Sequence, residues 1–435
     1  MFDSSLRPNE QRRLAQLGAA DIVIGIPTYK NAATIAHVLQ NAAKGAHTYF
    51  PALRTAIAVV DGGSSDETVT LATNVVLPPA IRRFVTSYQG LLGKGSAVRA
   101  IFEIARYMGA RVCIVLEADL VSLTPEWIPK LALPILSGEY AYVVPTYARP
   151  LVESAINDLL AYPLTRLLYN VDVRQPMAGD LALSGDLAGK LHDRDVWETD
   201  VARHGVDIWI TTVAVNENVP MCQVPLGPKI EHKHETAVAY DPGFVQIVGT
   251  LFRMLDIYRR RWIETRPLRV VPVCGEMVLP REQRLTGELT VQQLTAAFHA
   301  GTRRYRRFWR TILIPTNFEA VIELFNKTRS AIAFSAELWA RVVFDFAVVY
   351  NKGENDPDKV AAALLPLYYA RVATLLRETN AKLSAVEQVI QTQARIFAEQ
   401  KPYLVYRWQN YVPWELGGVR SVSYTHLTLP TIYSV

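Results

Sequence analysis

The sequence predicts an α/β protein in which a mostly parallel β-sheet flanked by helices is followed by an all-α C-terminal region. Over about the first 150 residues, short apolar runs alternate with amphipathic helical patterns. Several of these runs end in acidic or glycine-rich turns, and beyond residue 244 long helical patterns dominate. Such strand–helix alternation is typical of a parallel sheet with right-handed crossovers.

The elements of the first part follow from these patterns in chain order. A lead-in helix is expected before residue 20, and a loop of the kind found in active sites over residues 174–185. The predicted strands cover residues 21–27, 56–60, 83–88, 112–116, 140–146 and 221–226. The predicted helices cover residues 32–44, 66–74, 156–170 and 200–214. The stretch 90–96 opens another helix that ends at residue 108, and a further helix starts near residue 124.

The C-terminal part reads differently. Helices are predicted over residues 244–265, 290–308, 317–326, 330–350, 356–379 and 384–397, with residues 266–286 as a linker. We therefore divide the chain into a first domain at 1–243, a helical domain at 244–416 and a tail at 417–435. The tail has no helical period, and we expect it to be disordered or foreign to the domain.

Composition restricts the class of protein. The chain has 435 residues, 50% of them hydrophobic, and a net charge of +5. Basic residues cluster only at 303–307, so no nucleic-acid partner is expected. Three distant cysteines without metal spacing indicate free thiols in a reducing compartment. With no signal peptide and no apolar run of about 18 residues, we expect a cytoplasmic protein without a transmembrane segment.

The strand predicted at 112–116 leads directly into Glu117-Ala118-Asp119. An apolar run this short is typical of a strand buried on both faces, whose end lies at the ligand-binding edge of a parallel sheet. Hard cations such as Mg²⁺ and Mn²⁺ prefer oxygen ligands. Spacing alone leaves two readings open: a metal–diphosphate site, or solvated acids and helix caps.

Two further turns follow predicted strands. The turn from Asp61 to Asp66 places a carboxylate and backbone donors where a ribose or base could bind, although Asp-Gly turns are common. Gly93-Lys94-Gly95 opens a helix, and its lysine could meet a phosphate or base. It lacks the spacing of a P-loop, so a helix-start turn with a solvated lysine stays open.

These motifs, in this order, resemble those of GT-A (Rossmann-like) glycosyltransferases. The resemblance implies that Glu117 and Asp119 face a nucleotide-sugar, with Asp119 binding Mg²⁺ or Mn²⁺ and acting in catalysis. It also implies donor contacts from the first strand end, the second turn and the glycine-rich turn. The implied donor-binding residues are Pro27, Thr28, Tyr29, Asn31, Asp61, Gly93, Lys94, Gly95 and Glu117.

The middle of the chain narrows the resemblance. Segments 174–180, 205–207 and 223–229, followed by a histidine, resemble the retaining glucosyl-3-phosphoglycerate and mannosylglycerate synthases and their bacterial relatives. This resemblance covers about residues 20–240 and implies a late metal-ligand histidine. An ungapped register puts Glu231 at that position. We expect His232 to be the ligand, with Glu231 and His234 left open.

Several residues depart from the family pattern or have ordinary alternatives. Glu117 stands where the family has Asp, Asn31 where it often has an acid, and Ala178 where it has glycine. By resemblance, Asp207 faces the acceptor hydroxyl or the sugar, and Asp180 binds a sugar hydroxyl. Asp207 could equally stabilise the first turn of a helix, and Asp180 could be a turn residue.

The expected function is metal-dependent transfer of a hexose from a donor of the UDP-glucose or GDP-mannose type. The acceptor would be a small hydroxyl compound such as glycerate or 3-phosphoglycerate, and the resemblance implies retention of configuration. The alternatives are an inverting enzyme with Asp207 as base and a polysaccharide or lipid-linked acceptor, a nucleotidyltransferase, or a non-catalytic nucleotide-sugar-binding protein. The helical region is expected to cover the acceptor side or to mediate a homodimer.

Overall fold

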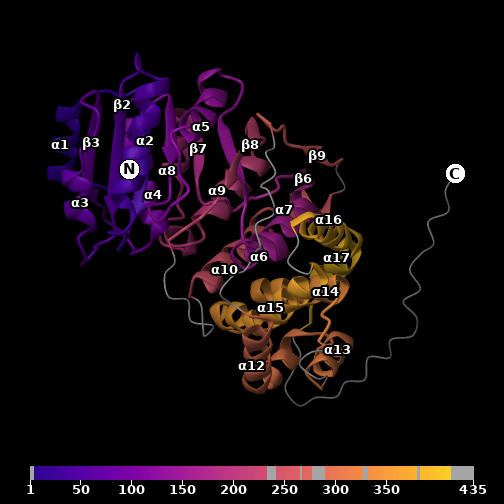
Figure 1. Cartoon of the computed structure of the whole chain (residues 1–435). Helices are drawn as coiled ribbons and strands as arrows, with labels where there is room; N and C mark the ends of the chain where they lie inside the picture. The colour runs from indigo at the N-terminus through magenta and orange to yellow at the C-terminus, as the bar shows by residue number, and fades with distance from the viewer. Residues whose placement is uncertain are drawn as a thin grey trace.

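The computed structural model describes residues 4–232, 242–264, 267–276, 290–326, 332–379 and 383–412. A sheet with its helices occupies one side of the molecule, and the C-terminal helices pack beside it (Figure 1). His234, the predicted tail and most of the predicted linker lie outside the described residues.

The central sheet confirms the predicted fold class. Within the described ranges it has seven strands in the order β3-β2-β1-β4-β7-β5-β8. Every pairing is parallel except those of β7, which runs antiparallel to both β4 and β5. The strands are β1 Ile22–Thr28, β2 Thr55–Asp61, β3 Ile81–Ser87, β4 Val112–Val115, β5 Tyr142–Ala148, β7 Leu181–Ser184 and β8 Met221–Pro228.

The loop expected over residues 174–185 was predicted wrongly in its second half, where β7 forms. Its four residues are too few to show a strand period, and glycines flank them on both sides. Because β7 fills the space between β4 and β5, it carries the preceding Gly179-Asp180 turn to the end of β4.

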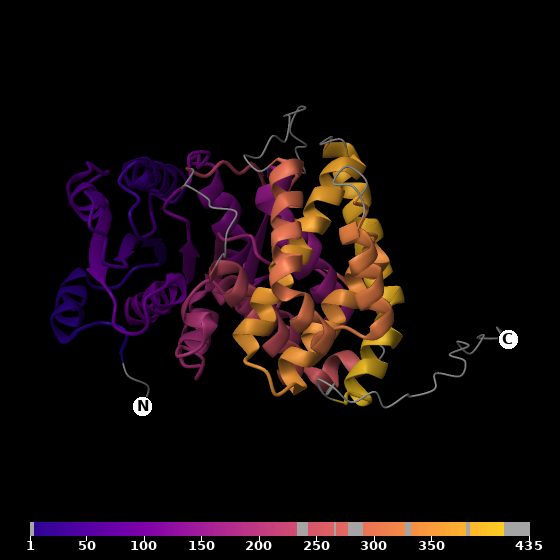
Figure 2. The ribbon, with the colours of Figure 1, turned by 90° about the horizontal axis from the view of Figure 1, so that it is seen from below.

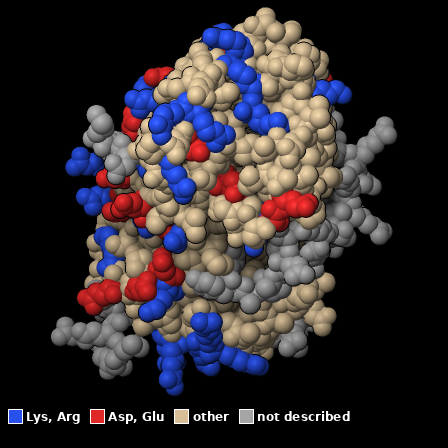
Figure 3. All heavy atoms as spheres, turned by 90° about the vertical axis from the view of Figure 1, so that its left-hand side faces the viewer, with Lys and Arg blue, Asp and Glu red and all other residues tan. Residues whose placement is uncertain are grey.

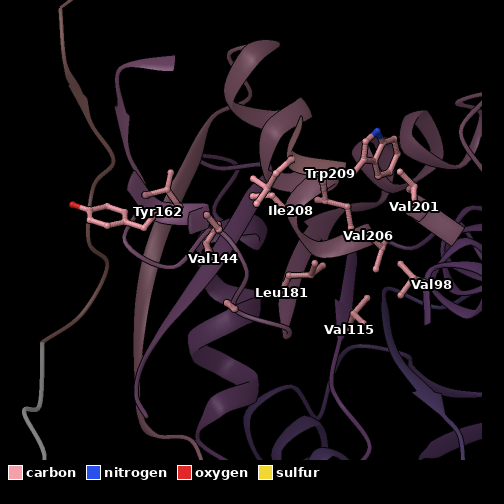
Figure 4. Packing of buried hydrophobic residues seen from close by; sticks show 14 of the residues in the cluster. Val98, Val115, Val144, Tyr162, Leu181, Val201, Val206, Ile208 and Trp209 are labelled. Atoms are coloured by element: carbon pink, nitrogen blue, oxygen red, sulfur yellow. The ribbon is translucent and has the colours of Figure 1, made fainter. Parts of the chain in front are cut away.

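Helices cover the faces of the sheet. They are α1 Pro8–Leu17, α2 Ile35–Tyr49, α3 Thr68–Asn74, α4 Lys94–Tyr107, α5 Trp127–Leu136, α8 Gly185–His192 and α9 Val206–Asn216, with a 3₁₀ turn at Asp200–Ala202. Apolar side chains from α4, β4, β7 and α9 join one core; Val98, Val115, Leu181 and Val206 are labelled in Figure 4. This packing is close: a Cβ at Gly25 would lie 2.2 Å from the side chain of Ile101 on α4.

The helical region contains α10 Pro242–Ile257, α11 Arg259–Ile263, α12 Val291–Ile312, α13 Pro315–Asn326, α14 Ala336–Lys352, α15 Pro357–Thr379, α16 Leu383–Glu399 and α17 Lys401–Gln409, seen from below in Figure 2. A two-stranded ribbon joins β6 Val171–Asp172 to β9 Arg269–Val270. The boundary at 243/244 stays a prediction, and α10 spans it.

Residues 151–169 connect the two regions. They form α6 Leu151–Ile156, a π-helical turn at Asn157–Ala161 and α7 Tyr162–Tyr169, and α7 packs on α16. The widened turn leaves carbonyls that the helical region satisfies. Trp339 Nε1 donates to the Leu159 carbonyl at 2.9 Å, and Gln393 Nε2 donates to the Asp158 carbonyl at 3.1 Å.

Among the helices described, α15 is long and apolar enough to cross a membrane by length and composition. Its most apolar window is 83% buried inside the protein, where α15 packs against α10, α12, α14 and α16. This is the environment of a core helix.

The surface carries charges of both signs. On the face that contains the β3 edge, basic and acidic side chains lie interspersed (Figure 3). All three cysteines are free, as predicted, and Cys113 and Cys222 are buried.

Candidate active site

Polar side chains gather where the parallel strands end. Glu117 and Asp119 lie just beyond β4, and their segment is fixed to the start of α2 because Thr34 Oγ1 donates to the Ala118 carbonyl at 2.7 Å. The ends of β5 and β8 adjoin this point, since Tyr147 is paired with Gly227. The sheet therefore brings residues distant in sequence to a single edge.

Glu117 is held by two ammonium groups. Its Oε1 accepts a hydrogen bond of 2.7 Å from Lys94 Nζ, and its Oε2 accepts one from Lys229 Nζ. Lys94 is the first residue of α4, and its Nζ also donates to Asp207 Oδ2 at 2.8 Å. Asp207 lies in the first turn of α9, so this chain of contacts joins α4, β4 and α9.

Lys229 is fully buried at the end of β8. Besides Glu117, its ammonium donates to Asp180 Oδ2 at 2.7 Å and to the Ala178 carbonyl at 2.9 Å, and it lies 3.3 Å from Glu231 Oε1. Asp180 has two further partners: the Tyr147 hydroxyl, at 2.8 Å from Oδ2, and the Glu117 N–H, at 2.8 Å from Oδ1.

Arg149, which follows β5, completes the basic side of the site. Its guanidinium pairs with Glu231, and it lies 5.8 Å from the centre of the Tyr147 ring. Lys229 Nζ lies 5.0 Å from the same ring centre. Both positive groups therefore gain a cation–π contact in addition to their carboxylate partners.

The carboxylates of Glu117, Asp119 and Glu231 lie close enough to share one cation, each with an oxygen within 4.8 Å of the others. Burial raises the pKa of Asp119 to about 7, and the neighbouring charges of Glu117 and Glu231 add to this effect. Burial also raises the pKa of Glu117. The ammonium groups of Lys229 and Lys94 have the larger combined effect, however, and hold the pKa of Glu117 well below the ordinary range.

The charge balance of the described site favours a bound cation. When all are ionised, five carboxylates (Glu117, Asp119, Asp180, Asp207 and Glu231) face three basic groups (Lys94, Lys229 and Arg149), which leaves an excess of two negative charges. One divalent cation would compensate this excess. Asp119 and Glu231 supply the hard oxygen ligands that Mg²⁺ and Mn²⁺ prefer, so the residues fit such an ion.

The predicted donor-binding residues of the first two strands form a neighbouring group. Thr28 and Asp61 are paired at the ends of β1 and β2. Both Asp61 oxygens accept hydrogen bonds from the following turn, the Gly63 and Ser64 N–H groups at 2.8 Å and the Ser64 hydroxyl at 2.6 Å. Asn31 Oδ1 accepts from Thr28 Oγ1 and from the Tyr29 N–H, both at 2.9 Å.

Within this group the Tyr29 side chain is 55% exposed beside Pro27, whereas the carboxamide of Asn31 is buried. Asp61 and Asn31 thus shape the turns at the ends of β1 and β2, and Tyr29 is available to a ligand.

The glycines of the Gly93-Lys94-Gly95 turn have a packing role. A Cβ at Gly95 would lie 1.8 Å from the Val201 carbonyl, and one at Gly93 would lie 2.6 Å from the Ala202 carbonyl. The Gly95 N–H donates to the Arg203 carbonyl at 3.0 Å. The glycines allow the turn to pack against residues 201–203, which places Lys94 between Glu117 and Asp207.

The structure brings together Lys94, Glu117, Asp119, Asp180 and Asp207, to which the resemblance assigned donor, metal and acceptor contacts; those roles stay predictions. His232 stays a prediction as a metal ligand: its N–H donates to the Asp119 carbonyl at 2.7 Å, and its side chain is exposed.

Sequence reasoning missed Lys229, Arg149 and Tyr147 as site residues. Each lies at or just after the end of β5 or β8 in the central sheet, and for Lys229 and Arg149 that position is the signal that could have found them.

Comparisons with known proteins give a family match and several solved structures. Residues 23–169 match the family described as glycosyl transferase family 2. A search of curated proteins gives no match. Solved structures with some similarity include glucosyl-3-phosphoglycerate synthase from Mycobacterium tuberculosis in complex with Mn²⁺, UDP and glucosyl-3-phosphoglycerate, at 20% identity, with 55% of this chain and 83% of that chain covered and a TM-score of 0.42.

The same enzyme with Mn²⁺, UDP-glucose and phosphoglyceric acid matches at 20% identity over 56% of this chain and 84% of that chain, with a TM-score of 0.41. The family match spans the segment from β1 to α7, which includes Lys94, Glu117 and Asp119. The chain therefore carries a glycosyltransferase family 2 domain, and the enzyme class predicted from its sequence, glycosyltransferase, is confirmed.

Proposed function

We propose that this glycosyltransferase moves a hexose from a nucleotide-sugar of the UDP-glucose or GDP-mannose type to a small hydroxyl acceptor, with Mg²⁺ or Mn²⁺ as cofactor. The observation that carries the proposal is the cluster of Glu117, Asp119 and Glu231 at the end of β4, with two negative charges in excess over the neighbouring basic groups. A divalent cation and a diphosphate are the pair of ligands that such an edge suits.

In this proposal Asp119 and Glu231 hold the cation, with His232 beside them. The bound cation would stabilise negative charge on the departing diphosphate. Lys94 lies between Glu117 and Asp207, and we assign it to the diphosphate side because it starts α4 next to the metal ligands. Because carboxylates outnumber basic groups at this edge, we infer that the cation binds first and that the anionic diphosphate binds after it.

Glycerate and 3-phosphoglycerate are the proposed acceptors. Support comes from the sequence resemblance and from the phosphoglyceric acid bound by the mycobacterial enzyme. A cytoplasmic location, the absence of a nucleic-acid partner and a homodimer stay predictions.

For the stereochemistry we propose retention, with the acceptor proton passing to an oxygen of the departing phosphate. Asp207 is the residue on which the inverting alternative depends. Its Oδ2 accepts from the Lys94 ammonium at 2.8 Å, which favours a role as ion partner. Burial raises its pKa, however, and this favours a proton acceptor, so the inverting reaction is kept as the second candidate.

A donor and acceptor screen tests the proposal. UDP-glucose and GDP-mannose are each incubated with glycerate or 3-phosphoglycerate, with Mn²⁺, Mg²⁺ or a chelator. We expect product only with metal, and at least about a hundredfold loss of kcat in Asp119→Ala. NMR of the new anomeric centre decides between retention and inversion. Turnover that is unchanged by chelator and by Asp119→Ala would contradict the metal site.

A further inference from the structure

We propose that Lys229 is a positioning residue that acts as a built-in cation, binding Glu117 so that the divalent cation is left to Asp119 and Glu231. This inference rests on the proposed function. It concerns which of the clustered carboxylates serve as ligands.

The surroundings of Lys229 are those of a bound cation. Its side chain has no exposed surface, and its ammonium contacts oxygens of Glu117, Asp180, Ala178 and Glu231. The Tyr147 ring lies beside it. A buried ammonium is costly unless it is paired, and here the oxygen partners come from three segments: Glu117, the turn at Ala178 and Asp180, and Glu231.

Both carboxylate oxygens of Glu117 are engaged by ammonium groups. One of its oxygens accepts from Lys94 and the other from Lys229, while Gly179 packs against the same carboxylate. A Cβ at Gly179 would lie 2.4 Å from Glu117 Oε2. Both oxygens of Glu117 accept from ammonium groups, whereas the contacts of Glu231 with Arg149 and Lys229 in the described part of the chain use Oε1 and leave Oε2 to a cation. Glu117 is therefore better placed as a counter-ion than as a ligand.

Lys229 also fixes the relative positions of the strand ends. Glu117 follows β4, Asp180 precedes β7, and Lys229 itself ends the β8 segment that leads to Glu231. Since Asp180 in turn accepts from the Glu117 N–H, the contacts form a closed ring around the backbone of the acid-x-acid motif. Asp119, two residues further on, is thereby directed to the cation.

Direct binding of Mn²⁺ to the full chain, without nucleotide, separates this role from a merely structural one. The variants are Lys229→Met, Glu117→Gln and the double variant, with Lys190→Met as control because Lys190 is an exposed lysine on α8. Free Mn²⁺ is measured by electron paramagnetic resonance, and circular dichroism verifies that each variant is folded.

Lys229→Met removes a positive charge and frees Glu117, so we expect Mn²⁺ to bind at least about tenfold more tightly. Glu117→Gln should weaken binding, because Lys229 then has one negative neighbour fewer. The double variant restores the net charge and should return to within about threefold of wild type. Asp180 loses its buried ammonium partner in Lys229→Met and in the double variant alike, so circular dichroism is required for both.

A double variant that binds Mn²⁺ as weakly as Glu117→Gln alone would overturn the proposal, since Glu117 would then be a ligand. Weaker Mn²⁺ binding in folded Lys229→Met would also overturn it, because removal of the ammonium would then not free Glu117 for the cation. Failure of the proposed function looks different: neither wild type nor any variant would bind Mn²⁺, and this result overturns the role of Lys229 as well. Lys190→Met should match wild type throughout.

Discussion

Asp119→Asn should stabilise the protein in the absence of metal, although it removes a proposed metal ligand. The pKa of Asp119 rises from its ordinary 3.8 to about 7, because burial and two neighbouring carboxylates oppose ionisation. At about 1.4 kcal/mol for each factor of ten in the acid constant, ionisation costs about 4 kcal/mol of folding free energy. Asp119 is partly exposed, so we expect about 2–3 kcal/mol after solvent screening.

The sign of the pH dependence follows from the raised pKa. Below about pH 4, Asp119 is protonated in the folded and the unfolded chain, and the cost is absent. Between about pH 4 and 7 the unfolded chain ionises first, so stability falls as the pH rises, and above pH 7 the loss is complete. The advantage of Asp119→Asn should therefore be small at pH 4.5 and full at pH 8.

Thermal unfolding in EDTA measures this difference, with an expected gain in Tm of about 2–4 °C at pH 8. Asp21→Asn is the matched control: hydrogen bonds from Arg54 lower the pKa of Asp21 to about 2, so its removal should reduce Tm at pH 8. If Asp119→Asn were less stable than wild type at pH 8, or if its effect were the same at both pH values, the electrostatic reasoning would be wrong.

Three further predictions follow from the contacts. Lys94→Met should reduce kcat/KM with the donor identified in the screen at least about a hundredfold, because the ammonium between two carboxylates is lost. Gly179→Ala should lower Tm and weaken Mn²⁺ binding, since Gly179 has φ of +89° and its Cβ would meet a carboxylate. Arg174→Met should lower the free energy of unfolding by about 3 kcal/mol, because Asp158, 2% exposed, loses its guanidinium partner and keeps only the neutral donors Ser154 and Asn157. Glu387→Gln, at the 53% exposed partner of the same arginine, should cost less than about 1 kcal/mol by urea denaturation.

The sheet could be predicted because its signals are local. Apolar runs such as that of β4 are bounded by glycine and acidic turns, and the carboxyl ends of parallel strands share one edge. For this reason Lys94, Glu117 and Asp119 could be expected near this edge from their positions, whereas Asp207, in the first turn of a helix, was assigned to the site only by the family resemblance. The short antiparallel strand β7 could not be predicted from the sequence. Its four residues are too few to show the two-residue period of a strand, and its direction depends on pairing with β4 and β5.

Lys229 shows why the remainder of the site was missed. In the sequence it is a single lysine after a Gly-Pro pair, which normally indicates a solvated side chain. Its burial depends on Glu117 and Asp180, distant in sequence and delivered by other strands. Gly93 and Gly95 are a similar case. They were expected to bind the donor, whereas in the structure their missing side chains allow close packing against the backbone of residues 201–203.

A crystal of the full chain grown with UDP and Mn²⁺, measured at the manganese absorption edge, would show where the cation binds. We predict one anomalous peak between the diphosphate and the carboxylate of Asp119, with Glu231 as the second protein ligand. Glu117 should remain on Lys94 and Lys229. A peak away from Asp119, or UDP bound at a different edge of the sheet, would contradict the proposed donor site.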